Sequence, residues 1–190
     1  AVVCLQRLQT PGAEPLLLAR LKVEPEEYLQ NEILKGLRDV AGPASLEPLL
    51  EWVPSAATRS AWVAVLGKSL GVDLAALEAT AASLGARADW ATARSLVDGF
   101  PREGLDEEGL AAHDRLTART LSLWLLSEGV LEGREAFLRD ASGRLGDLAA
   151  SDPSPSEWFI LRGRVDRLAG EASAAFSSFR AAVAAGVGED

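Results

Sequence analysis

The stretch SEWFILRGRVDRLAGEASAAFSSFRAAVAAG, residues 156–186, decides the fold of this chain. Apolar residues recur every three or four positions on each side of Ala169-Gly170, which is the spacing of a buried stripe along an α-helix. A glycine between two such stretches marks the end of one helix and the start of the next. The spacing therefore predicts two helices, near 155–168 and 171–185, joined by a short turn.

The composition of the whole chain has the same bias. Leu and Ala supply 64 of the 190 residues, whereas Val, Ile and Thr together number only 21. Leu and Ala are strong helix formers, and β-branched residues are the ones that strands favour. Further helices are expected near 119–131 and 135–149, and because no breaker separates Glu107 from Leu126, one long helix is expected to run through that interval. The prediction is an all-α protein.

The charge balance excludes several classes of function. The chain carries 19 Lys+Arg against 28 Asp+Glu, a formal net charge of −9, which argues against nucleic-acid binding through a general basic surface. No apolar run approaches the ~20 residues that span a bilayer, and no signal peptide is recognisable, so we expect no membrane insertion and a cytoplasmic location. Cys4, the sole cysteine, is expected to be a small buried hydrophobe. The missing initiator Met favours a processed form or a fragment of a longer protein.

The first half of the chain repeats at about 29 residues. Shifting 25–42 forward by 29 aligns similar residues at the pairs Pro25/Pro54, Ile33/Trp62, Leu34/Val63, Leu37/Leu66 and Gly42/Gly71. Pro suits the first turn of a helix, the apolar set makes one buried stripe, and Gly ends a helix in the left-handed conformation. A second short helix is expected after each Gly, carrying Leu46, Leu49, Leu50 and Val53 in one case and Leu74, Leu77 and Ala81 in the other.

This pattern resembles short HEAT-type repeats over residues 1–85, with a partial unit at 1–22 and full units at 24–53 and 54–85. The resemblance implies helical hairpins that stack side by side. An irregular helical bundle with short turns is the alternative interpretation of the same spacing.

The second half repeats at 34 residues. Trp90, Trp124 and Trp158 are 34 residues apart, and the same shift aligns Gly129 with Gly163, Ala141 with Ala175, Leu145 with Phe179 and Leu148 with Ala182. The small residues are expected to let the two helices of a unit approach closely, and Leu145 and Phe179 to fill the gap to the next unit. The first unit, near 87–118, matches poorly beyond its Trp.

The 34-residue period and the spacing of Ala175, Phe179 and Ala182 resemble tetratricopeptide repeats over residues 86–190, with Pro153 at the position that ends a unit. Together the two resemblances imply an α-solenoid of stacked antiparallel helical hairpins in one continuous superhelix. The family binds partners on the concave face made by the first helix of each unit. Carried over, that face presents Leu123, Leu126, Val130 and Arg134, then Glu157, Ile160, Arg164 and Arg167. Val130 and Arg164 stand where the family's carboxylate clamp has Asn, so a clamp for a peptide C-terminus is not expected.

Residue types that carry chemistry are sparse, and we predict no catalytic, cofactor-binding or metal-ligating residue. His113 lacks a second His at helical spacing, so it is interpreted as a solvated helix residue in preference to a metal ligand. The acidic run 103–114 is interpreted as a helix start capped by Asp106, with attraction of a basic partner as the alternative. The five Trp residues are interpreted as core, with a ligand-stacking surface as the alternative.

These observations predict a protein that is not an enzyme but a scaffold or adaptor binding a peptide or helix of another protein. The partner-binding residues are expected to be Leu123, Leu126, Arg134, Ile160, Arg164 and Arg167. A solvated helix face is the alternative reading of the arginines. A regulatory or assembly segment of a larger multidomain enzyme or transcriptional regulator is the alternative function. The oligomeric state is left open.

Overall fold

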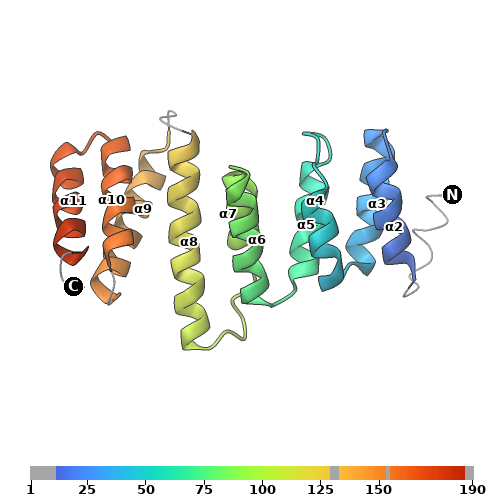
Figure 1. The fold of residues 1–190 in the computed structure, drawn as a ribbon, viewed down its shortest axis with the longest axis horizontal. Helices are drawn as coiled ribbons and strands as arrows, with labels where there is room; N and C mark the ends of the chain where they lie inside the picture. Colours follow the sequence, from blue (N-terminus) through green and yellow to red (C-terminus); the bar gives the residue numbers. More distant parts are fainter. Residues whose placement is uncertain (1–11, 129–132, 153–154, 187–190) are drawn as a thin grey trace. The chain divides into compact units, whose positions relative to one another are not determined.

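Ten α-helices and one short 3₁₀ helix account for the regular structure of the residues described here. The structure is a computed structural model that describes residues 12–128, 133–152 and 155–186, and within these ranges it contains no strand (Figure 1). The all-α prediction is confirmed. Predictions made for Cys4, Gly129, Val130 and Pro153 concern positions outside the described residues. The chain divides into two compact units, Ala1–Glu103 and Gly104–Asp190.

Unit 1 is a succession of short helices. They are α2 (Ala13–Val23), α3 (Glu27–Val40), the 3₁₀ helix η1 (Pro43–Ser45), α4 (Leu46–Glu51), α5 (Arg59–Leu70), α6 (Leu74–Ala86) and α7 (Trp90–Asp98). Consecutive helices pack against each other in the pairs α2–α3, α4–α5, α5–α6 and α6–α7. Helices two apart also pack, in the pairs α3–α5, α4–α6 and α5–α7.

The 29-residue pattern is reproduced in the core of unit 1. Ile33 and Leu37 of α3 and their counterparts Trp62 and Leu66 of α5 are each no more than 1% exposed. The match is weaker at Val63, which is only half-buried where Leu34 is fully buried. Trp62 also donates a hydrogen bond from Nε1 to the carbonyl of Leu49, at 2.9 Å, which joins α5 to α4.

The predicted helix ends in unit 1 are partly wrong. Gly71 ends α5 with a positive φ of 58°, as expected, but Gly42 is extended, with φ −124°. Gly42 precedes Pro43, and the proline ring disfavours helical geometry in the residue before it. Val53 lies outside α4, which ends at Glu51, and is 77% exposed.

The two repeat prolines also lie outside the helices that they were expected to begin. Pro25 is two residues before α3, where the Glu24 carboxylate accepts a hydrogen bond from the Glu26 N–H at 3.2 Å and holds the chain extended. Pro54 is five residues before α5, ahead of a turn in which the Thr58 N–H donates to the Ser55 carbonyl at 3.2 Å. These local hydrogen bonds delay the start of each helix.

Unit 2 consists of four longer helices: α8 (Glu107–Glu128), α9 (Glu135–Ser151), α10 (Ser156–Leu168) and α11 (Ala172–Gly186). The continuous helix expected through 107–126 is confirmed. Asp106 caps it by accepting the Gly109 N–H at 2.8 Å, which confirms the capping interpretation of the acidic run. Helix α10 packs against α8, α9 and α11, so it is the central helix of the unit.

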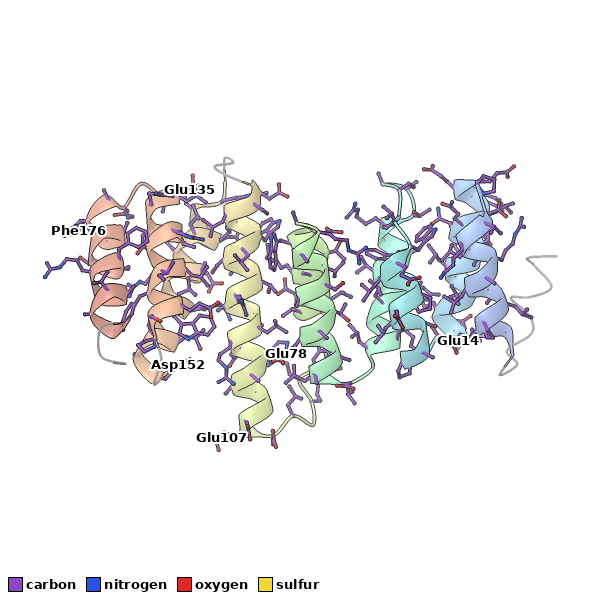
Figure 2. The ribbon with its side chains drawn as sticks, in the orientation of Figure 1. Glu14, Glu78, Glu107, Glu135, Asp152 and Phe176 are labelled. Atoms are coloured by element: carbon purple, nitrogen blue, oxygen red, sulfur yellow. The ribbon has the colours of Figure 1, made fainter. Side chains whose placement is uncertain are left out.

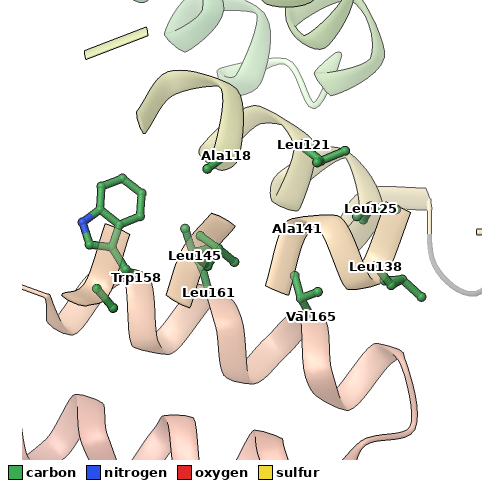
Figure 3. Packing of buried hydrophobic residues seen from close by; sticks show 10 residues of the cluster. Ala118, Leu121, Leu125, Leu138, Ala141, Leu145, Trp158, Leu161 and Val165 are labelled. Atoms are coloured by element: carbon green, nitrogen blue, oxygen red, sulfur yellow. The ribbon is translucent and has the colours of Figure 1, made fainter. Parts of the chain in front are cut away.

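The core of unit 2 lies between α8, α9 and α10 (Figure 3). Leu125 of α8, Leu145 of α9 and Val165 of α10 are completely buried at its centre. Ala141, which was expected to allow close packing, is also completely buried there. The inward stripes of three helices therefore share one apolar cluster, and α11 packs against another side of α10.

A single buried carboxylate joins α9, α10 and α11. Asp166 of α10 is 4% exposed. Its Oδ1 accepts a hydrogen bond from the Ser142 hydroxyl of α9 at 2.6 Å, and its Oδ2 accepts one from the Ser178 hydroxyl of α11 at 3.2 Å. Arg162 Nε lies 3.9 Å from Oδ2 and offsets part of the charge. The carboxylate thereby fixes the neighbours of the central helix on both sides.

The turns after α6 and α10 have the same hydrogen bonds but different residues in the left-handed position. In each, the chain closes through a six-residue loop: Asp89 N–H to the Leu84 carbonyl at 3.0 Å, and Glu171 N–H to the Asp166 carbonyl at 2.9 Å. The left-handed residue is Ala88, φ 58°, in the first turn and Gly170, φ 81°, in the second. A Cβ is unfavourable in this conformation.

We expect Ala88→Gly to raise the free energy of unfolding by about 1 kcal/mol and Gly170→Ala to lower it by about 1 kcal/mol. Urea unfolding followed by far-ultraviolet circular dichroism measures both changes. Stability changes of the same sign in the two variants would contradict this account of the turns.

Candidate partner-binding surface

Three of the predicted partner-binding residues form an exposed stripe along α10. Ile160, Arg164 and Arg167 follow one another at spacings of four and three, so they share one side of the helix. Ile160 is 40% exposed and both arginines are exposed. Within the described ranges neither Arg164 nor Arg167 forms an ion pair. The stripe thus offers an apolar side chain followed by two guanidinium groups that are free to bind.

The predicted residues of α8 lie beside this stripe. Arg119 of α8 and Glu157 of α10 form an ion pair, with Nε and Oε1 3.3 Å apart. Leu123 and Leu126 follow Arg119 at spacings of four and three on α8, and both are half-buried against the core of unit 2. Packing of α8 and α10 over the shared core brings the two stripes together, and the ion pair links them at the surface.

Arg134, the sixth predicted residue, does not join this surface. It precedes α9 as the N-cap residue, and its side chain is only 17% exposed. Its guanidinium carbon lies 4.2 Å from the centre of the Trp124 ring, and Nη2 is 3.7 Å from Glu128 Oε2. Trp124 is one residue after Leu123, about 100° around the helix, so Arg134 covers a different side of α8. Its role here is packing and charge pairing within unit 2.

The five tryptophans do not form a stacking surface. Trp62 and Trp158 are buried, as the core interpretation predicted, and Trp52, Trp90 and Trp124 are half-buried. The three at 34-residue spacing contact different groups. Trp90 lies over Gly85, Trp124 meets Phe137 edge-on at 6.0 Å, and Trp158 donates from Nε1 to Asp152 Oδ2 at 2.7 Å. Their regular spacing is therefore not accompanied by equivalent contacts.

Helix α11 carries an apolar hollow that the sequence analysis missed. Phe176, labelled in Figure 2, is 64% exposed and Val183 is 67% exposed. With Phe179, Arg180 and Ala184 they line an open hollow of about 540 Å³. The signal was the seven-residue spacing of Phe176 and Val183, two turns apart on α11 and off its buried stripe of Ala175, Ser178 and Ala182. An exposed apolar patch of this kind is typical of an interaction surface.

Phe179 was expected to fill the gap to a following unit, and this expectation is wrong. Its ring instead lies against Gly163 of α10, where a Cβ would come within 2.6 Å of Phe179 Cε1. The close approach of α10 and α11 expected at Gly163 is confirmed, and it is this approach that draws the ring inward.

The remaining polar candidates are parts of the scaffold. His113 is 4% exposed, which corrects its interpretation as a solvated residue: α8 is buried on the side of His113 and Thr120 as well as on the side of Leu121 and Leu125. On the surface of unit 1, the hydrogen bond and charge of Glu32 raise the pKa of Lys35.

Among the described residues no group of three or more His, Cys, Asp or Glu is placed to hold a metal ion. None of the described helices combines the length and apolar character needed to cross a membrane.

Comparison of the chain with protein-family models, with curated proteins and with solved structures finds no match.

Proposed function

We propose that this protein is a non-catalytic interaction module that binds a peptide or helix of a partner protein on the surface formed by α8 and α10. The observation that carries the proposal is the exposed stripe of Ile160, Arg164 and Arg167, which the Arg119–Glu157 ion pair links to the α8 stripe of Leu123 and Leu126.

The proposed architecture is a stack of antiparallel helical hairpins, HEAT-like over 1–85 and tetratricopeptide-like over 86–190. The packing within each unit supports it. In unit 1 the pairs α3–α5 and α4–α6 contact each other across one intervening helix, and in unit 2 α8 and α10 do so. Stacked repeats have this pattern because each repeat buries its apolar face only against its neighbours. Such stacks offer extended surfaces suited to peptides and helices.

The proposed recognition combines an apolar anchor with charged contacts. An apolar side chain of the partner would pack on Ile160, Leu123 and Leu126, and most of the affinity would come from these few contacts. Arg164 and Arg167 would contribute directed hydrogen bonds at the border, since a guanidinium binds a carboxylate through two parallel N–H groups. The core below keeps α8 and α10 in place, so little ordering of the surface is needed on binding.

A peptide-display selection tests this proposal. Random peptides are selected on the protein and then measured against Ile160→Asp, with Arg139→Glu as a control because Arg139 is an exposed arginine of the neighbouring α9. We expect Ile160→Asp to weaken the selected peptides at least about tenfold, since it places a charge at the apolar anchor, and the control to leave them unchanged. Selected peptides that bind Ile160→Asp as tightly as the parent would rule out this surface.

A further inference from the structure

The hollow on α11 continues the exposed stripe of α10. Phe179 is half-buried with its ring against Gly163, which is three residues after Ile160 and four residues before Arg167. Positions three and four apart are neighbours on a helix surface. The ring that lines the hollow therefore borders the stripe, and the two features form one surface on α10 and α11.

Three exposed arginines lie along this surface. Arg164 and Arg167 belong to α10, and Arg180 lies over the Phe176 ring at 5.9 Å. In the part of the chain that the structure describes, none of the three forms an ion pair. Of the carboxylates on α10, Glu157 is paired with Arg119 and Asp166 is buried. In a chain with a net charge of −9, this surface is locally positive.

We propose that the partner segment is acidic and amphipathic: one large apolar side chain enters the hollow between Phe176 and Val183, and its carboxylates pair with Arg164, Arg167 and Arg180. This proposal rests on the proposed function and names the chemistry of its ligand. Charge complementarity selects an anionic partner, and the apolar hollow selects one that also carries a hydrophobic anchor.

Two other occupants fit this surface less well. A second copy of the chain in a symmetric dimer would place the same surface on both sides of the interface, so two locally positive surfaces would meet. A nucleic acid would meet the three arginines but would be repelled by the rest of a strongly acidic chain, and its phosphates would leave the apolar hollow unfilled.

The position of Arg180 favours binding through the hollow. The Arg180 guanidinium carbon lies 5.9 Å from the centre of the Phe176 ring, within reach of a cation–π attraction, so its positive charge lies beside the hollow. A ligand side chain entering beside Phe176 would bring its neighbouring carboxylates to this guanidinium.

Fluorescence anisotropy with defined peptides tests the proposal on the full chain. The probe is a labelled peptide of Glu and Leu at helical spacing with one central Trp, and its matched forms replace every Glu by Gln or every apolar residue by Ser. We expect saturable binding of the Glu form that weakens with added salt. Both matched forms should bind at least about tenfold more weakly, since one loses the charge pairs and the other the anchor.

Variants of the protein locate the binding. Arg180→Glu and Phe176→Ala are each expected to weaken the acidic peptide by about tenfold. The matched controls are Arg139→Glu and Val72→Ala, the latter truncating a side chain that is 72% exposed in unit 1, and both should bind like the parent. Because Phe176 and Arg180 are exposed, their variants should keep the parent's circular dichroism and thermal unfolding.

Specific outcomes would overturn the proposal. If the Glu and Gln peptides bound with equal affinity, the partner would not be recognised by its charge. If Phe176→Ala bound the Glu peptide as tightly as the parent, the hollow would not hold the apolar anchor. Either result would contradict the proposal. If a single-stranded oligonucleotide bound more tightly than the Glu peptide, the surface would be a nucleic-acid site. If the protein formed a symmetric dimer that Phe176→Ala prevented, the surface would be a dimer interface. If the display selection gave neutral peptides whose binding was weakened by Ile160→Asp, the proposed function would be supported and only the acidic character of the partner would be contradicted. If no peptide of any composition bound, both proposals would fall.

Discussion

Replacing Trp62 by alanine is expected to lower the free energy of unfolding of unit 1 by about 3–5 kcal/mol. The indole is 1% exposed, so its removal leaves a cavity in the core. The substitution also leaves the Leu49 carbonyl without the Nε1–H donor that it accepts at 2.9 Å. This residue joins α4 to α5, and its loss affects the apolar burial and the hydrogen bonding of that pair together.

The control for this prediction is Trp62→Phe. Phenylalanine keeps most of the apolar volume but lacks the N–H, so its cost is expected to be about 1–3 kcal/mol. Urea unfolding followed by far-ultraviolet circular dichroism gives both values. A cost of Trp62→Ala no larger than that of Trp62→Phe would show that the indole volume is not central to the core.

Replacing Asp166 by alanine is expected to destabilise unit 2 by about 2–3 kcal/mol. The substitution leaves the Ser142 and Ser178 hydroxyls without their acceptor and removes the negative charge beside Arg162, whose Nε also donates to the Ser142 hydroxyl at 3.4 Å. Since these groups come from α9, α10 and α11, the packing of all three helices is loosened. The proposed binding surface lies on α8 and α10 and continues onto α11, so peptide affinity should fall as well.

Asp166→Asn is the matched control, because the amide retains the shape and one oxygen acceptor. We expect a cost of about 1 kcal/mol, measured by thermal unfolding of the two variants side by side. If Asp166→Ala were as stable as the parent, the carboxylate would be dispensable for joining the helices.

The helices of unit 2 could be predicted from the sequence because periodicity and breakers agree there. Apolar residues at helical spacing extend to Leu168 and resume after Gly170, and α10 and α11 end and begin at those places. After Gly109 in the first turn of α8, no Gly or Pro occurs up to Leu126, which was enough to predict α8 as continuous. The spans of these helices depend on apolar spacing and on helix-breaking residues, so they can be predicted from a single sequence.

What could not be predicted depends on which neighbour covers each side of a helix. His113 is surrounded by charged residues in the sequence, yet α8 is buried on two sides and His113 lies on one of them. The tetratricopeptide resemblance placed Arg134 on the concave face with Leu123 and Leu126, but its N-cap position turns it onto Trp124. Phe176 and Val183 resemble core residues in the sequence, and only the packing of α11 leaves them exposed.

The contact between Gly163 and Phe179 has a consequence for the order of folding. Glycine inside a helix costs about 1 kcal/mol relative to alanine, so the segment of α10 is a weaker helix former in isolation than its other residues suggest. Alanine would restore that propensity, but its Cβ would overlap the Phe179 ring, 2.6 Å away. Short helices are marginal alone and gain their stability from packing. Helices α10 and α11 are therefore expected to form together, as one hairpin, instead of one after the other.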